Sequence, residues 1–286
     1  MKIIKYFFEF LIIIILFIIF KILGMKFASN FGSFIGGSLG PFFRSKKKIT
    51  LNIKKALPET SEKNIEIIAK EMWKNYGRIL SEYVFIKNFR DSINEKFITV
   101  EGQEVLDNIK SSEEPVIFIS GHFNNFELMA MQIEKSGINL AAIYRPLNNI
   151  FVNIIMERIR KNYICKNQIK KGQSGIRELL SLFHKGHSIA LMIDQRLSEG
   201  IKSKFFGEEA YTTTMPAQFV KKFDCKIVPI YIERINGINF KMKVFEPIKY
   251  DKNIPTEKIT SDLNSWLERM ILNNPGQWIW SHDRWK

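Results

Sequence analysis

An apolar stretch over residues 3–23 places the strongest constraint on how this chain can fold. Only Lys5, Glu9 and Lys21 interrupt it, all near its ends. A helix that crosses the hydrocarbon core of a bilayer needs about 20 apolar residues, and this stretch is long enough. A cleaved signal peptide is the alternative, but such a peptide has a shorter apolar core with a small-residue cleavage site close behind it. We therefore expect residues 1–26 to form a retained transmembrane anchor.

Basic residues flank the apolar stretch unequally. Lys2 and Lys5 lie at its start, whereas Lys21, Lys26 and the RSKKK cluster at residues 44–48 follow it. Because Lys and Arg are enriched on the cytoplasmic side of a membrane segment, the heavier basic side should be cytoplasmic. The sequence predicts a single-pass protein whose main body faces the cytoplasm.

Residues 27–48 are rich in phenylalanine and glycine and end in that basic cluster. This order is typical of a segment that lies among lipid headgroups, where each Lys or Arg gains about 1 kcal/mol from an anionic leaflet. A glycine-bearing helix packed on the main body is an equally good interpretation. We expect an interfacial basic segment and leave the packed helix open.

The net charge limits the class of partner. The chain of 286 residues carries 43 Lys and Arg against 29 Asp and Glu, a formal charge of +14. Anionic lipid, an acidic carrier protein and nucleic acid would all suit this charge. We expect no nucleic-acid partner, since no recognition motif appears and part of the charge lies next to the membrane. No CxxC pair, HExxH motif or phosphate-binding glycine loop occurs, so we predict neither a metal nor a cofactor.

After the basic cluster, helical and strand patterns alternate. Alternation at this spacing predicts an α/β fold with a central, mostly parallel sheet flanked by helices, over residues 49–286. The length allows one catalytic domain. The predicted strands cover residues 97–101, 115–120, 140–144, 188–194 and 226–233, and the predicted helices cover residues 64–87, 150–160, 175–184 and 258–272.

The segment EEPVIFISGHFNNFELMAMQIEKSG, residues 113–137, carries the clearest chemical signal. An apolar strand ends at Ser120, Gly121 permits a tight turn, and a helix is predicted to begin near Asn124 or Asn125, both good N-cap residues. His122 therefore lies in the turn and Glu127 in the first turns of the helix. This placement lets the two side chains meet.

A carboxylate bonded to one imidazole nitrogen leaves the other nitrogen free to take a proton from an alcohol. The alkoxide could then attack a thioester carbonyl, provided that donors stabilise the oxyanion. A non-catalytic interpretation is also open on spacing alone, with His122 a turn residue and Glu127 a solvated helix acid. Acyl transfer to a hydroxyl is the activity that these two residues would support.

Taken in order, the motifs of the chain resemble the late acyltransferases of lipid A biosynthesis, the lauroyl and myristoyl transferase family. The HxxxxE signature is GHFNNFE, with His122 and Glu127. It is followed by YRPLNN, Arg160, IDQR, FFG, TTT, VPIYIERING and PGQWIWSHDRWK, so that the resemblance spans nearly the whole chain, anchor included. It implies a glycerolipid-acyltransferase-like fold and a place in the bacterial inner membrane.

The resemblance also implies the roles of individual residues. His122 would be the general base and Glu127 its orienting partner, while Arg160 and Asp194 would complete the active site. Arg145 would suit a substrate phosphate or the oxyanion, because a guanidinium presents a rigid fork of donors. A purely structural ion pair is the alternative for Arg145.

The family resemblance implies an acyl carrier protein as donor and a hydroxyl of an anionic glycolipid, a lipid A precursor, as acceptor. Another lipid acceptor, such as a lysophospholipid or a different glycolipid, stays open. Glycerolipid enzymes carry a Phe-Pro-Glu-Gly element where this chain reads MIDQR, which favours lipid A. An inactive membrane scaffold of the same fold is the alternative from another class.

Overall fold

In the part of the chain that the computed structural model describes, residues 2–92 and 96–286, seven strands form one sheet in the order β1-β9-β8-β2-β5-β3-β4. All neighbouring pairs are parallel except β8 and β9, so the sheet is mostly parallel, as predicted. Its strands are β1 (Ile98–Glu101), β2 (Ile117–Ser120), β3 (Leu140–Tyr144), β4 (Asn167–Lys170), β5 (Ser188–Met192), β8 (Ile227–Asn236) and β9 (Asn239–Val244).

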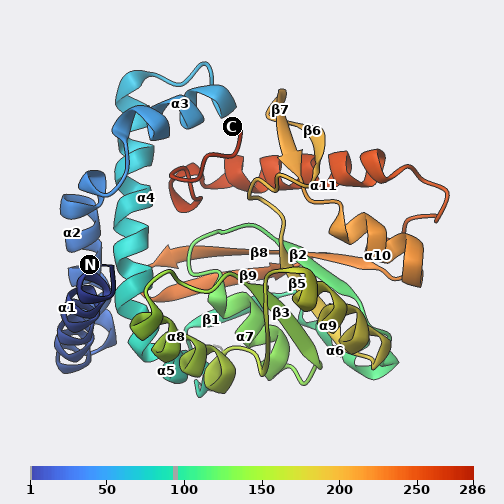
Figure 1. Ribbon diagram of the computed structural model, residues 1–286, viewed down its shortest axis with the longest axis horizontal. Helices are drawn as coiled ribbons and strands as arrows, with labels where there is room; N and C mark the ends of the chain where they lie inside the picture. Colours follow the sequence, from blue (N-terminus) through green and yellow to red (C-terminus); the bar gives the residue numbers. More distant parts are fainter. Residues whose placement is uncertain (1, 93–95) are drawn as a thin grey trace.

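Helices cover both faces of the sheet. Figure 1 shows α10 (Met215–Phe223) and α11 (Thr256–Asn273) above β8 and β2, and α7 (Glu127–Lys135) and α8 (Ile150–Tyr163) below them. The other sheet-associated helices are α6 (Gln103–Ser112) and α9 (Gln173–His184), and a separate antiparallel hairpin consists of β6 (Ile201–Phe205) and β7 (Glu208–Thr212). This arrangement confirms the predicted α/β class.

The first four α-helices of the described chain lie at one end of the molecule (Figure 1). They are α1 (Lys2–Leu23), α2 (Met25–Leu39), α3 (Lys46–Ala56) and α4 (Glu62–Glu82), with a short 3-10 helix η1 (Gly40–Phe42) between α2 and α3. The predicted helix over residues 64–87 is in fact divided. It ends at Glu82, and η2 (Tyr83–Phe85) and α5 (Ile86–Arg90) follow.

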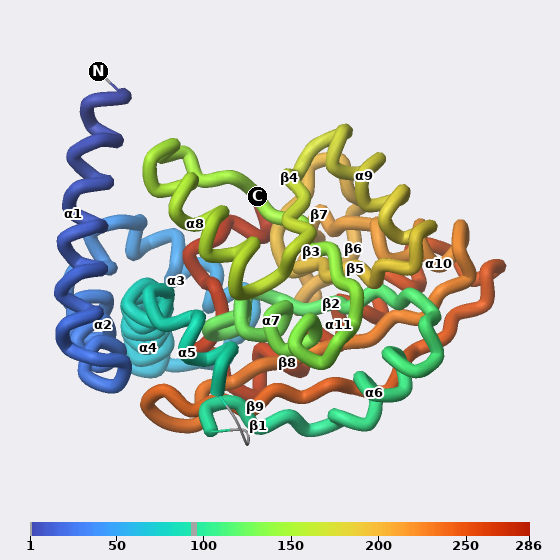
Figure 2. Tube along the Cα trace, turned by 90° about the horizontal axis from the view of Figure 1, so that it is seen from below, coloured from blue at the N-terminus to red at the C-terminus, as the bar shows by residue number. Residues whose placement is uncertain are grey.

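Among the described residues, α1 is the one helix whose length and composition would allow it to cross a membrane. Figure 2 shows its N-terminal part reaching beyond the rest of the chain. Its other end is held by the buried side chains of Phe17 and Phe20. Nearer its start, the side-chain amide of Asn149 donates to the carbonyl of Tyr6 at 2.8 Å. The apolar stretch therefore both projects outward and packs on the domain.

Helix α2 packs closely on α4 through glycines. A methyl group added at Gly77 of α4 would overlap the backbone of Gly32 and Gly36 on α2. The opposite face of α2 is apolar and open, with Phe27 71% and Phe34 69% exposed. Residues 27–48 thus contain the packed helix that the sequence left open. An interfacial position for the exposed phenylalanines stays a proposal.

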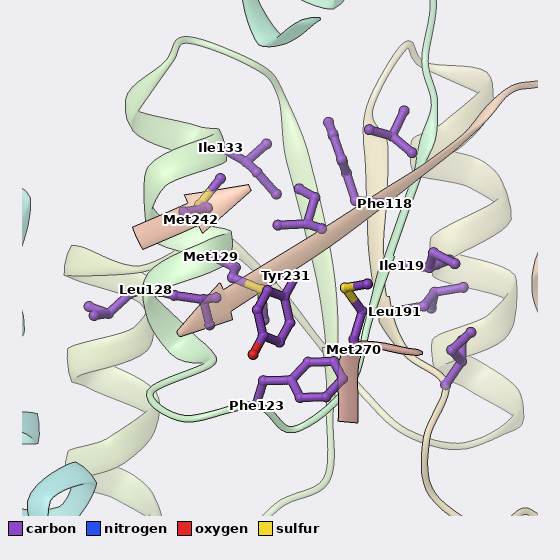
Figure 3. Packing of buried hydrophobic residues seen from close by; sticks show 14 of the residues in the cluster. Phe118, Ile119, Phe123, Leu128, Met129, Ile133, Leu191, Tyr231, Met242 and Met270 are labelled. Atoms are coloured by element: carbon purple, nitrogen blue, oxygen red, sulfur yellow. The ribbon is translucent and has the colours of Figure 1, made fainter. Parts of the chain in front are cut away.

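The core extends up to the turn that contains His122. Phe123 is 1% exposed, and its ring meets Tyr231 of β8 edge-on at 5.0 Å between centroids. Figure 3 shows these two rings side by side at the end of the cluster that includes Met129 of α7 and Met270 of α11. Burial of Phe123 fixes the backbone of the turn, because withdrawing this ring from the core would cost about 3–5 kcal/mol.

Sequence analysis missed β4, β6, β7 and β9. NQIK has one buried residue, the hairpin strands IKSKF and EEAYT have three between them, and β9 (NFKMKV) alternates buried side chains with exposed or partly exposed ones. Such strands lack the apolar run that identified the central ones. Their pairing is fixed by neighbouring strands rather than by their own composition.

The close approach of α2 and α4 gives a stability test. Gly77→Ala should lower the free energy of unfolding by about 1–3 kcal/mol, because the added methyl has no space between the two helices. Thermal or denaturant unfolding in detergent would measure this.

Gly37→Ala is the matched control. It lies on α2, the helix that packs against α4, and gains the same helix propensity, but its methyl would meet only the flexible side chain of Lys74. Equal stability of the two variants would contradict the tight packing described here.

Candidate active site

Two parallel strands bring His122 and Asp194 together. Ser120 at the end of β2 pairs with Met192 at the end of β5. His122 and Asp194 each lie two residues beyond these strand ends. Because parallel strands end at the same edge of a sheet, the register that pairs the strands also places the imidazole opposite the carboxylate.

The Asp194 carboxylate is buried, with 0% of its surface exposed, and accepts three N–H groups. Its Oδ1 lies 2.8 Å from Nδ1 of His122. Its Oδ2 accepts the backbone N–H of His122 at 2.7 Å and the indole N–H of Trp278 at 2.9 Å. This pairing assigns the Nδ1–H tautomer to His122 and leaves Nε2 as the basic nitrogen, with 19% of the side chain exposed.

The pair shifts both pKa values. Burial acts to lower the pKa of His122, but the charge and hydrogen bond of Asp194 outweigh burial, so that the pKa is raised. Burial acts to raise the pKa of Asp194, but the charge of His122 and the N–H donors hold that pKa below its usual value. Asp194 therefore stays ionised, and His122 is a stronger base than a free imidazole.

Glu127 occupies a different place from the one predicted. The acid bonded to the imidazole is Asp194, whereas Glu127 accepts from Nε and Nη2 of Arg160 at 2.8 and 2.5 Å. The phenol of Tyr83 lies 3.4 Å from the same carboxylate oxygen. Glu127 is 8% exposed and still contributes to the raised pKa of His122 through its charge. The predicted hydrogen bond between Glu127 and His122 is therefore wrong. The structure has two neighbouring pairs instead, His122 with Asp194 and Arg160 with Glu127.

The turn itself explains this arrangement. The helix begins at Glu127, later than the predicted start at Asn124 or Asn125. Asn124 has a φ of 45°, in the left-handed region, and its side-chain oxygen accepts the backbone N–H of Asn125 at 2.8 Å. A left-handed residue cannot continue into a helix, so Glu127 starts the first turn and points toward Arg160.

A second buried ion pair holds the turn from the other side. Arg234 of β8 donates to both carboxylate oxygens of Glu82 at 2.6 and 3.0 Å. Glu82 also accepts from the side-chain amide of Asn125 at 3.0 Å and from the hydroxyl of Ser29 on α2 at 2.7 Å. Removing one partner of such a pair typically costs 3–5 kcal/mol. The pair thus connects helix α2 to the turn that carries His122.

The C-terminal segment closes the site. Gln277 accepts the side-chain N–H of Asn124 at 2.6 Å and the backbone N–H of Arg234 at 2.8 Å. Trp278 beside it donates to Asp194. In the sequence PGQW is a family motif without a role of its own, and the contacts show that Gln277 and Trp278 hold the turn and Asp194 in position.

A basic cavity of about 690 Å³ opens beside the pair. Arg145, Lys171 and Arg196 line it, and the backbone N–H of Arg196 donates to Nε2 of His282 at 3.0 Å. Burial lowers the pKa of His282, which keeps its imidazole neutral. Arg145 thus lies where a substrate anion could reach it. In residues 2–92 and 96–286, no group of three or more His, Cys, Asp or Glu side chains gathers as a metal ion would require.

With this geometry in view, comparisons identify the family. The sequence model of the family described as "Bacterial lipid A biosynthesis acyltransferase" matches residues 1–286. The chain belongs to this family. It is therefore an O-acyltransferase of lipid A biosynthesis by family, as its motifs predicted.

Curated relatives agree at low identity. The lipid A biosynthesis palmitoleoyltransferase of Escherichia coli (strain K12) is 22% identical over 262 residues, which cover 89% of this chain and 83% of that protein. The lauroyltransferase of the same organism is 22% identical over 253 residues, covering 85% of this chain and 79% of the relative.

Among solved structures, the 1-acyl-sn-glycerophosphate acyltransferase of Thermotoga maritima is 15% identical. The match covers 86% of this chain and 93% of that one with a TM-score of 0.38, a similarity too low to support a conclusion.

The Asp194–His122 contact can be tested by titration. In Asp194→Asn the pKa of His122 should fall, because burial continues to disfavour the imidazolium while the compensating charge is gone. NMR titration of the imidazole would measure the change.

Glu127→Gln serves as the comparison, since Glu127 acts on His122 through charge without bonding Nδ1. It should lower the pKa of His122 by less. A larger effect from Glu127→Gln than from Asp194→Asn would show that the wrong acid has been assigned to the imidazole.

Proposed function

We propose that His122 and Glu127 are the catalytic residues of an enzyme that moves a fatty acyl group from an acyl carrier protein thioester to a hydroxyl of a lipid A precursor. The observation that carries this proposal is the basic Nε2 of His122, whose other ring nitrogen is held by a buried carboxylate. Nε2 itself meets the side-chain amide of Gln195 at 3.5 Å, a long contact that a substrate hydroxyl can replace. A histidine held in this way is suited to removing a proton from an alcohol.

In the proposed reaction, Nε2 of His122 takes the hydroxyl proton while the oxygen attacks the thioester carbonyl. A tetrahedral intermediate forms with the negative charge on the former carbonyl oxygen. When the intermediate collapses, the carbon–sulfur bond breaks and the new ester remains. The leaving thiolate takes the proton back from Nε2, so that the enzyme returns to its starting state.

Glu127 and Arg160 would stabilise charge during this reaction. Arg160 is held by Glu127, yet its Nη1 is buried without a hydrogen-bond partner in the described residues. A buried donor that is already oriented costs little reorganisation when an oxyanion forms beside it. We assign Arg160 to the oxyanion and Glu127 to holding Arg160 in place, while Asp194 orients His122.

The charge of the chain supports anionic substrates. An acidic carrier protein and a phosphorylated glycolipid would both be drawn to a molecule of net charge +14. The projecting apolar part of α1 supports attachment to the bacterial inner membrane, with the basic flank and the catalytic domain on the cytoplasmic side. Both substrates would then meet at the inner leaflet.

The activity has a direct test. Purified enzyme given acylated carrier protein and a lipid A precursor should yield an acylated product by mass spectrometry. His122→Ala should lose about 10²- to 10⁴-fold in turnover, the range that a general base contributes. Glu127→Ala should lose about 10²- to 10³-fold, the cost of removing an oxyanion donor, because Arg160 is no longer held in place.

His184→Ala is the control, because His184 is exposed at the end of α9. Normal turnover in both active-site variants would rule out the proposed site. A lysophospholipid in place of the glycolipid tests the other acceptor class. Donor binding with no turnover on any acceptor would instead identify an inactive scaffold.

Orientation in the membrane is a separate prediction. In inverted inner-membrane vesicles, added protease should degrade the catalytic domain, and in right-side-out vesicles the domain should be protected. The positive flank of α1 is the physical reason. Protection in inverted vesicles would place the domain on the opposite side.

A further inference from the structure

The basic cavity continues the edge of the sheet that carries the His122–Asp194 pair. Arg145 directly follows β3 and Lys171 directly follows β4, where Tyr144 pairs with Lys170. The backbone N–H of Lys171 donates to the carbonyl of Tyr144 at 2.8 Å, which holds the two strand ends together. Both cations are therefore presented by rigid strand ends rather than by a free loop.

Arg196 joins this group from β5, the strand between β2 and β3. It lies two residues beyond Asp194, so that the cavity begins next to the catalytic carboxylate. The Nε of Arg196 is buried with no partner within the described residues. A buried guanidinium donor that lacks an acceptor is costly, and an anionic ligand would supply one.

The three cations are also free of carboxylates. Two acids also line the cavity, Glu199 and Asp283, and Asp283 pairs with Lys48 at 3.0 Å. Across the described residues, no salt bridge joins Arg145, Lys171 or Arg196 to an acid. Basic side chains outnumber the two acids in the lining, so the cavity keeps an excess of positive charge. An unneutralised group of cations in a hollow attracts an anion of concentrated charge, such as a phosphate.

The residues at the rim of the cavity indicate whether the bound anion belongs to a lipid or to a water-soluble protein. Phe43 lines the cavity at 76% exposure, and Phe42 beside it is 86% exposed. Arg44 follows at once and lines the same cavity. Exposed aromatic rings next to cations are typical of the boundary between acyl chains and headgroups. The cavity therefore faces a lipid rather than a water-soluble protein.

We propose that Arg145, Lys171 and Arg196 form a binding site for a phosphate group on the lipid acceptor, and that this site sets the acceptor's hydroxyl against Nε2 of His122. The inference rests on the proposed function for the identity of the acceptor. It adds a specificity site: the enzyme selects acceptors that carry phosphate and binds this group with residues that follow three neighbouring strands, β3, β4 and β5.

The test compares one lipid in two forms. Wild-type enzyme in detergent micelles should bind a phosphorylated acyl disaccharide more tightly than the same lipid after removal of its phosphates. In the double variant Arg145→Ala/Lys171→Ala this preference should fall about tenfold or more, since each substitution removes charged hydrogen-bond donors. Titration calorimetry measures affinity, and steady-state kinetics should show the loss in KM for the acceptor.

Lys221→Ala/Lys222→Ala is the matched control. It removes the same charge from the last turn of α10, just before the amino end of β8, and should keep the preference for phosphate. Arg145→Lys in place of Arg145→Ala should restore part of the preference, because it retains the charge.

The donor is tested separately with acylated carrier protein and with an acyl pantetheine that lacks phosphate. If the double variant raises KM only for the donor that carries phosphate, the cavity serves the donor and the proposal is overturned. Unchanged selectivity in the double variant also overturns it. A third outcome separates the two proposals. If the wild-type enzyme shows no turnover but prefers the phosphorylated lipid, and the double variant lacks this preference, the phosphate site is supported and the proposed function fails.

Discussion

The buried carboxylate of Asp194 is the group on which the geometry of the candidate active site depends. An isolated charge without exposure to water would cost several kcal/mol, and the three N–H groups around it offset that cost. Those donors come from the turn after β2 and from the C-terminal segment. Satisfying one charge therefore requires two distant parts of the chain to meet, and their meeting creates the site.

The ion pair of Glu82 and Arg234 meets the same requirement on the opposite side of the turn. Asn125 contacts Glu82 while Asn124 contacts Gln277, so that the residues between His122 and Glu127 are fixed at both ends. A rigid turn holds the imidazole in one orientation before substrate arrives, which is how preorganisation lowers a barrier. Because the turn is rigid, Asp194 stays bonded to His122 while Glu127, nearby, stays bonded to Arg160.

Much of this could be predicted from the sequence. Apolar runs identified the central strands and α1, and the strand-to-turn pattern placed His122 at a sheet edge. The contact between His122 and Asp194 could not be predicted from these patterns. It depends on β2 lying beside β5, and the local pattern of apolar residues does not determine the order of strands in a sheet. Glu82 was equally hidden: at the end of an amphipathic helix it has the pattern of a solvated acid, and only the packing of α2 and β8 buries it.

The position of Gln277 and Trp278 has a consequence for the order of events during synthesis. A ribosome releases the apolar helix α1 early, and every strand of the sheet has been made before the indole that bonds Asp194 emerges. With α1 as the proposed membrane anchor, attachment to the bilayer would precede assembly of the candidate active site. Under that proposal a nascent chain would already lie at the surface that carries its substrate when the site forms, and a product that ends before residue 277 would lack the donor that completes the site.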